Sequence, residues 1–141
     1  MATLEKAIEI AVNAHKGQLD RYGAPFLMHV FRVMNAGKNK NEKIAGVLHD
    51  IVEKTDYTFG QLQAEGFSTE IILAVKCLTK ESEDEDYNDY IKRVKTNFLA
   101  VKVKLNDLTD NLDLKRISEL TEKDIPRFNK YLKAYKELIE L

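Results

Sequence analysis

Apolar residues recur three and four positions apart along most of the chain, which is the period of an amphipathic α-helix. No segment shows the strict alternation of apolar and polar positions that is typical of a half-buried strand. The pattern therefore predicts an all-α fold of about seven or eight helices joined by short links. No repeat and no Pro-, Gly- or Ser-rich tract marks a boundary, so we expect one compact domain over residues 1–141.

Caps, glycines and prolines divide this pattern into elements. The predicted helices begin near Thr3, Pro25, Asn41, Thr58, Ser68, Tyr87, Phe98 and Lys123. We expect the third helix to run unbroken from its cap, Asn41, through about Lys54. Pro126 falls in the first turn of the last helix, where proline costs no internal hydrogen bond. The acidic segment 80–86 predicts a solvated loop.

Composition limits the class of protein without naming an activity. With 22 basic and 23 acidic residues and a net charge of -1, the chain is not expected to bind DNA or RNA polymers. The single Cys77 excludes an internal disulfide, and no apolar run approaches the roughly 20 residues of a membrane span. No secretory leader pattern opens the chain, so we expect a cytoplasmic protein without a membrane partner. The oligomeric state is left open.

The three histidines, the residues best suited to metal or acid–base chemistry at neutral pH, all lie in the first third of the chain. On an unbroken third helix, His49, Asp50 and Glu53 would share one flank. Two metal-binding groups and a carboxylate that can orient water would then project together. The alternative is the polar edge of a surface helix, and the pattern alone does not decide between them.

Other polar residues also allow two interpretations. His29 stands between apolar residues, and it could be either a metal ligand or a histidine packed in the core. His15, near the end of the first helix, fits a structural role in which an imidazolium complements the helix dipole. Asp107 and Asn111 lie one turn apart, with Asp110 on the neighbouring edge. They could bind a metal and a sugar or phosphate, or they could belong to a polar helix surface without function.

Four segments in order carry a further signal: Ala14-His15-Lys16-Gly17-Gln18, Gly23-x-Pro25-Phe26-x-x-His29, Leu48-His49-Asp50-x-Val52-Glu53 and Val103-Lys104-Leu105-x-Asp107. Together they resemble the motifs of the HD-domain metal-dependent phosphohydrolases. Within that superfamily they look most like the (p)ppGpp hydrolase domain of SpoT and Rel proteins and its small stand-alone relatives. The resemblance extends over nearly the whole chain and implies an HD-domain helical bundle.

The resemblance also implies a metal centre. His29, His49, Asp50 and Asp107 would hold one divalent cation, a donor set suited to borderline and hard ions. Manganese is the ion of the alarmone hydrolases, with iron, zinc, cobalt, nickel and magnesium as alternatives. Glu53 would be the catalytic residue that holds the attacking water or accepts its proton.

Three further residues are implied to contact the substrate, a small phosphorylated nucleotide or metabolite. Arg21 matches a basic residue that could meet phosphate or stack on a base. Asn111 matches an asparagine that contacts the nucleotide. Lys54 could add positive charge near a phosphate, or it could point to solvent. Five residues are weaker candidates for the pocket lining, with helix packing favoured for the tyrosines: Tyr87, Tyr90, Arg127, Lys130 and Tyr131.

Three positions depart from the alarmone hydrolases. Lys54 replaces the second acid of a Glu-Asp pair, and Asp20 and Leu108 stand where those enzymes carry arginines. The shared motifs nevertheless imply a guanosine-3′,5′-bis(diphosphate) 3′-pyrophosphohydrolase-like enzyme. The alternatives are a hydrolase of another small phosphate ester and a catalytically silent sensor that binds a nucleotide or metal. A helical interaction protein that docks through the acidic loop is a further alternative.

Overall fold

Helices account for the regular structure of the chain, as the hydrophobic period predicts. The computed structural model describes all of residues 1–141. In chain order the elements are α1 (Leu4–His15), α2 (Phe26–Ala36), α3 (Lys40–Leu48), α4 (Ile51–Lys54), α5 (Phe59–Ala64), α6 (Thr69–Leu78), α7 (Tyr87–Lys95), α8 (Phe98–Asn111), the 3₁₀ turn η1 (Leu114–Arg116) and α9 (Asp124–Ile139). One isolated bridge, between Leu19 and Pro25, is the only strand-like pairing. With α3 and α4 counted as one predicted element, the number agrees with seven or eight.

Most helix starts lie where the caps predict them. The side chains of Thr3, Thr58 and Ser68 each accept a backbone N–H from the first turn of the helix that follows. Pro126 occupies the third position of α9, inside the first turn. The chain turns after α1 at Gly17, whose φ of +84° is a conformation that favours glycine.

The unbroken third helix is the one wrong prediction among the elements. Asn39, not Asn41, caps α3 by accepting the backbone N–H of Glu42. The helix stops at Leu48, and Asp50 has φ -104° and ψ 1°, outside the helical range. The ring Nδ1 of His49 lies 2.6 Å from the carbonyl oxygen of Gly46, so the side chain shares an acceptor with the backbone and tightens the turn.

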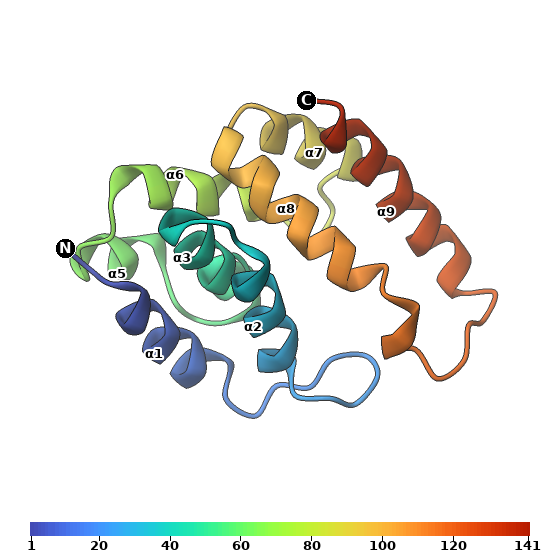
Figure 1. The fold of residues 1–141 in the computed structure, drawn as a ribbon, viewed down its shortest axis with the longest axis horizontal. Helices are drawn as coiled ribbons and strands as arrows, with labels where there is room; N and C mark the ends of the chain where they lie inside the picture. Colours follow the sequence, from blue (N-terminus) through green and yellow to red (C-terminus); the bar gives the residue numbers. More distant parts are fainter.

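Helix α8 is the centre of the packing. It contacts α2, α3, α6, α7 and α9, and it runs diagonally through the middle of Figure 1. The core is one cluster of 26 buried apolar residues, to which α8 contributes Leu99, Val103 and Leu108 among others. Because it is surrounded, α8 buries polar side chains as well: Lys104, Asp107 and Asp110.

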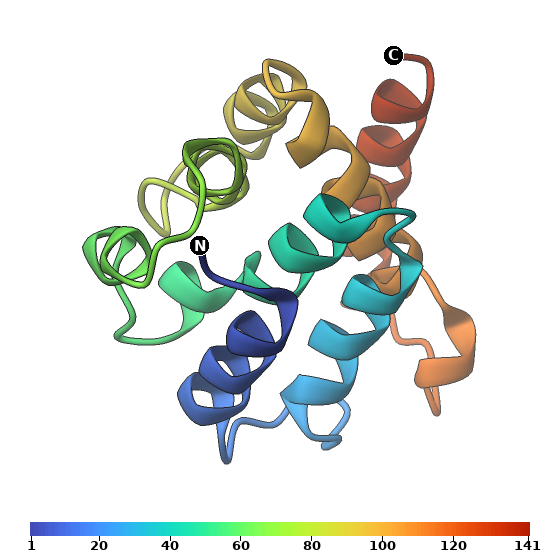
Figure 2. The ribbon, with the colours of Figure 1, turned by 60° about the vertical axis from the view of Figure 1, so that its left-hand side comes forward.

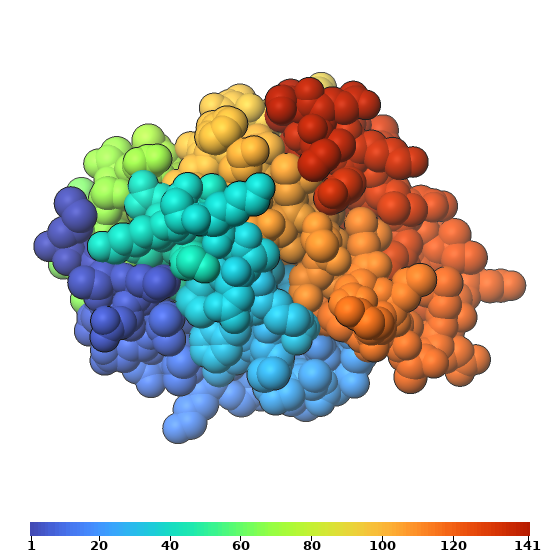
Figure 3. Space-filling view, viewed as in Figure 1, coloured from blue at the N-terminus to red at the C-terminus, as the bar shows by residue number.

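The remaining helices form two groups on either side of α8. Helices α1 to α4 pack together on one side, and α9 lies along α8 on the other, as the second view makes clear (Figure 2). The segment around η1 lies at the surface between α2 and α9 (Figure 3). None of these helices has both the length and the apolar character needed to cross a membrane.

The acidic loop is only partly the solvated segment that its charges predict. Glu81 and Glu83 are exposed. Glu85, however, is paired with the guanidinium of Arg93 on α7, which donates from Nη2 to Oε1 at 2.9 Å and also bonds the carbonyl oxygen of Thr79. Asp86 caps α7. The loop is therefore fastened to α7 at its far end.

Candidate metal centre and cleft

Four ligand atoms from three parts of the chain meet beside α8. His29 comes from α2, His49 and Asp50 from the turn between α3 and α4, and Asp107 from α8. One nitrogen or oxygen from each residue lies within 4.8 Å of the other three. These are the four residues that the sequence resemblance implies as metal ligands, and the fold brings all of them together.

Because α3 ends at Leu48, the neighbouring residues His49 and Asp50 can both direct their side chains to the cluster. His49 Nε2 lies 3.0 Å from Asp50 Oδ2 and 3.4 Å from Asp107 Oδ1. His49 is 2% exposed, so the surface-edge interpretation of this residue is wrong. The flank of an unbroken helix is also wrong as the geometry, because Asp50 leaves the helical conformation.

The two imidazoles are both oriented with Nε2 towards the carboxylates. His49 Nδ1 faces the Gly46 carbonyl oxygen, and His29 Nδ1 faces Asp110 Oδ2 at 2.6 Å. Both of these oxygens accept only, so each Nδ1 carries the hydrogen and each neutral ring leaves a lone pair on Nε2. For His29 that atom lies 3.0 Å from Asp107 Oδ1.

The electrostatics of the cluster are strongly perturbed. Burial lowers the pKa of His49, but the carboxylates of Asp50 and Asp107 outweigh it and hold that pKa well above its ordinary value. Burial raises the pKa of Asp107, but Lys104 and then the two imidazoles outweigh it and hold it well below the usual range. The pKa of Asp50 falls to about 2, chiefly because His49 outweighs its burial.

This donor set fits a divalent cation. Two imidazole nitrogens and two carboxylate oxygens suit borderline to hard ions. His49 Nε2 is buried without a hydrogen bond of acceptable geometry, which is unusual for a polar atom that no ligand satisfies. Metal binding would displace the protons that the raised imidazole pKa values retain, because a ligating imidazole must be neutral. The cluster is therefore a candidate metal centre.

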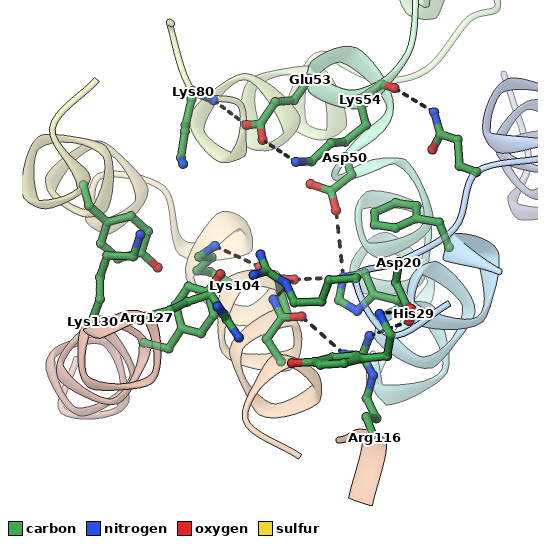
Figure 4. A pocket seen from close by; sticks show the side chains of 18 of the residues that line it. Asp20, His29, Asp50, Glu53, Lys54, Lys80, Lys104, Arg116, Arg127 and Lys130 are labelled. Carbon is green, nitrogen blue, oxygen red and sulfur yellow. Dashed lines mark hydrogen bonds and ion pairs between the residues drawn. The ribbon is translucent and has the colours of Figure 1, made fainter. Parts of the chain in front are cut away.

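A cleft of about 490 Å³ opens over this cluster (Figure 4). His29, Asp50 and Asp107 line it, whereas His49 lies behind them. The other predicted site residues also line the cleft: Glu53, Arg21, Lys54 and Asn111. The five weaker candidates line it as well: Tyr87, Tyr90, Arg127, Lys130 and Tyr131. Twelve of these thirteen residues therefore line one cleft, and His49 reaches it through the cluster.

Glu53 and Lys54 lie at one side of the opening. Glu53 Oε1 accepts the backbone N–H of Lys80 at 3.0 Å, and its Oε2 lies 3.6 Å from the ammonium nitrogen of Lys54. The Lys54 side chain is half exposed and lines the cleft, so it lies outside the buried metal-ligand cluster. Glu53 is thus a carboxylate fixed at the cleft wall, with a cation beside it.

The cleft carries more positive than negative side chains, and several repel one another. Lys130 on α9 shows the effect: partial burial, and then repulsion from Lys80, Lys104, Arg127 and Arg21, lowers its pKa. Figure 4 shows Lys130 and Arg127 across the opening from Asp50 and His29. A concave site where cations repel one another is stabilised by an anion.

Arg116 and Asp20 also line the cleft, and the sequence analysis gave neither of them a site role. Arg116 donates from Nη2 to Asp20 Oδ2 at 3.1 Å. Asp20 Oδ1 accepts the backbone N–H groups of Tyr22 and Ala24, so this carboxylate shapes the loop that carries Arg21. Asp20, at a position where the sequence resemblance implies an arginine, is therefore an acid that is matched by Arg116.

Lys104 is a further residue to which the sequence analysis gave no site role. It is buried, and its ammonium nitrogen lies 2.8 Å from Asp107 Oδ2 and 5.0 Å from the centre of the Tyr90 ring. A signal was present in the sequence, because Lys104 interrupts the apolar stripe of Val101 and Leu108 one turn before Asp107. Asn111 donates to the other oxygen, Asp107 Oδ1, at 3.1 Å.

His15 is more deeply placed than its position at a helix end indicates. It is 1% exposed, and burial lowers its pKa, which disfavours the imidazolium form. Its Nδ1 lies 2.8 Å from Gln18 Oε1, and the Gln18 amide donates to the Lys54 carbonyl oxygen. The ring packs on Phe26, which packs on His29. A structural role holds, through packing rather than charge.

Comparison with solved structures defines the class of fold. The structure of a metazoan ortholog of SpoT, described as hydrolysing ppGpp, superposes with a TM-score of 0.80 at 21% identity, over 98% of this chain and 85% of that one. The chain therefore has the all-α fold of an HD-domain ppGpp hydrolase. No family model matches it.

Sequence relatives identify the group more narrowly. A guanosine-3′,5′-bis(diphosphate) 3′-pyrophosphohydrolase of Spiroplasma citri is 37% identical over 83 residues, 56% of this chain. The protein of that name from Haemophilus influenzae is 32% identical over 116 residues, 73% of this chain. A probable GTP pyrophosphokinase of Mycobacterium leprae is 34% identical over 84 residues. The chain spans 10% to 17% of the length of these proteins and is a relative of the SpoT/Rel group.

Proposed function

We propose that this chain is a metal-dependent hydrolase of guanosine-3′,5′-bis(diphosphate) that removes the 3′-diphosphate as pyrophosphate. The observation that carries the proposal is the convergence of His29, His49, Asp50 and Asp107 at the floor of a cleft rich in cations. The names of the Spiroplasma and Haemophilus relatives support the same reaction. Manganese is the proposed ion, with iron, zinc, cobalt, nickel and magnesium as alternatives.

The chemistry divides between the cation and the protein. A divalent cation in this centre would polarise a phosphoryl oxygen and lower the pKa of a coordinated water. Glu53, fixed by the Lys80 N–H, accepts the proton of the attacking water. The new bond forms between that oxygen and the phosphorus attached to the 3′ oxygen, and the bond from phosphorus to the 3′ oxygen breaks. The proton is passed to the leaving 3′ oxygen, so the products are GDP and pyrophosphate.

The cationic residues handle the charge of the substrate. Arg21 and Lys54 at the rim contact phosphate oxygens, and Lys130 and Arg127 meet a phosphate group on the opposite wall. Asn111 contacts the nucleotide while its amide group continues to hold Asp107. These contacts place charge where negative oxygens crowd during the reaction.

The first experiment is metal content of the purified chain together with pyrophosphate release from ppGpp in added manganese. About one metal per chain and release of pyrophosphate are expected. The Asp107→Ala variant is expected to lose metal and turnover. Because Lys104 is then a buried charge without its partner, this variant also loses stability, about 3–5 kcal/mol. Asp50→Asn removes a ligand without exposing such a charge and should lose metal while it keeps the helical circular dichroism signal.

One observation favours a second candidate, a sensor that binds nucleotide or metal without turnover. Lys54 stands beside Glu53 where alarmone hydrolases have a second acid, so only one carboxylate handles water. Metal and ppGpp binding without release of any product across a panel of phosphate esters would select the sensor. Release of phosphate from another ester, but none from ppGpp, would select a different substrate for the same centre.

A further inference from the structure

Asp110 stands next to the metal centre and accepts hydrogen bonds from two arginines and one histidine. It is 8% exposed, and its Oδ2 lies 2.6 Å from His29 Nδ1. Arg32 donates to Oδ1 at 2.6 Å and to Oδ2 at 3.2 Å, and Arg116 donates to Oδ2 at 2.9 Å. These side-chain contacts are separate from the backbone hydrogen bonds of α8, and they join α8 to α2 and to η1.

We propose that Asp110 is a positioning residue for the metal centre, holding His29 by Nδ1 so that Nε2 faces Asp50 and Asp107. The inference rests on the metal site of the proposed function. A carboxylate that accepts the Nδ1 hydrogen of a ligating imidazole fixes the tautomer and the ring orientation and makes Nε2 a better donor. His29 has no other polar partner on that side.

The arginines determine how firmly this carboxylate is held. Arg32 approaches from α2, the same helix as His29, and binds both oxygens of Asp110. Arg116 approaches from η1 and also bonds the backbone oxygen of Asp110, so the carboxylate is held from two sides. Because the fixed geometry depends on all three contacts, loss of one arginine should loosen His29 less than loss of Asp110.

Arg116 also connects this network to the cleft edge. Its second terminal nitrogen donates to Asp20, the acid that shapes the loop bearing Arg21. The same guanidinium lies 3.3 Å from Asn111 Oδ1, and Asn111 donates to Asp107. Through Asp110 and Asn111, Arg116 is thus connected to the proposed metal ligands His29 and Asp107, and through Asp20 to the loop that carries Arg21. We therefore include Arg116 with Asp110 among the residues that position the metal ligands.

The test measures Mn²⁺ affinity of the full chain by competition with a fluorescent chelator. Asp110→Ala should weaken Mn²⁺ binding by about 10- to 100-fold. Asp110→Asn keeps an acceptor oxygen without the charge and should recover part of that loss. Arg32→Gln should weaken binding by a smaller factor than Asp110→Ala. Asp84→Asn, in the exposed acidic loop, removes the same charge far from His29 and should leave the affinity unchanged.

A second readout separates positioning from a general effect on folding. In the chain loaded with diamagnetic Zn²⁺, which would occupy Nε2, the Nδ1 proton of His29 should give an NMR resonance shifted downfield by its hydrogen bond to Asp110. Asp110→Ala should shift this resonance or remove it through solvent exchange, while the Nδ1 proton of His49, bonded to the Gly46 carbonyl oxygen, stays unchanged. Equal Mn²⁺ affinity and an unchanged His29 Nδ1 resonance in a folded Asp110→Ala chain would overturn the inference. Mn²⁺ binding without ppGpp turnover would count against the proposed function alone.

Discussion

The two walls of the cleft are built in opposite ways. On the wall formed by α2, the turn before α4, α4 itself and α8, acidic and basic groups lie beside one another: His29, His49 and Asp107 are at most 5% exposed and in contact within the cluster. On the wall formed by the start of the acidic loop and α9, Lys80 and Lys130 repel each other and lie over the ring of Tyr87, and neither forms an ion pair with a carboxylate. The first wall pairs acids with bases around the proposed cation site, and the second wall carries unpaired cations that an anion would stabilise.

This contrast separates two kinds of contribution to the same reaction. The matched wall fixes atoms, because buried and mutually bonded groups move little and hold pKa values far from ordinary ones. The cationic wall contributes attraction, which acts over a longer distance and depends on salt. A substitution on the first wall should therefore affect the chemical step, and one on the second should affect substrate affinity.

The largest effect is expected for Glu53→Gln. The amide keeps the shape of the side chain and still accepts the Lys80 N–H, but it cannot take a proton. Loss of a general base lowers kcat by about 10²–10⁴-fold with little change in KM for ppGpp. Steady-state release of pyrophosphate gives both constants, and Glu122→Gln at an exposed position is the matched control. A kcat within threefold of wild type would remove Glu53 from the reaction.

A smaller effect of the opposite kind is expected for Lys130→Met. The substitution removes a cation from the α9 wall while keeping its apolar stem, so KM for ppGpp should rise by roughly tenfold and kcat should hold. Lys133→Met, an exposed residue on the same helix, is the matched control and should change neither constant. The difference between the two variants should shrink in high salt. A fall in kcat alone would mean that the two walls do not divide the work as proposed.

The smallest effect concerns the fastening of the acidic loop, which carries Lys80 at its start. Arg93 holds the pKa of Glu85 at about 2, below its ordinary 4.5. The folded chain thus binds fewer protons than the unfolded chain below pH 4.5, and the stabilisation is lost as the pH falls from about 5 to 2. Urea unfolding of Glu85→Gln should show a free energy lower by about 1 kcal/mol at pH 7. The two proteins should converge near pH 2, and parallel pH curves would contradict this.

Much of the helical fold could be predicted, because its signals are local. Thr58 and Ser68 begin helices through bonds to residues three positions away. The break after Leu48 could not be predicted, since Asn41 to Lys54 is periodic and helix-compatible throughout. At the break the His49 ring contacts the Gly46 carbonyl oxygen, a contact that the hydrophobic period does not encode.

The site divides in the same way. The metal candidates and Glu53 carry a recognisable order along the sequence, so the resemblance named them before the fold did. Arg116 carries no such signal, because its partners Asp20 and Asp110 lie 96 and 6 residues away and only the tertiary fold brings them together. Lys104 was visible as a charge on an apolar stripe but needed Asp107 beside it to be interpreted.

The turn at His49 and Asp50 has a consequence for assembly of the centre. Two of four ligand groups are adjacent in sequence, so bringing them together costs almost no loop-closure entropy. His29 and Asp107, by contrast, are 20 and 57 residues from them, and a cation that joins all four would act as a cross-link between α2, α8 and this turn. Saturating metal should then protect the amides of α2 and α8 from hydrogen exchange more than those of α5, which contributes no ligand.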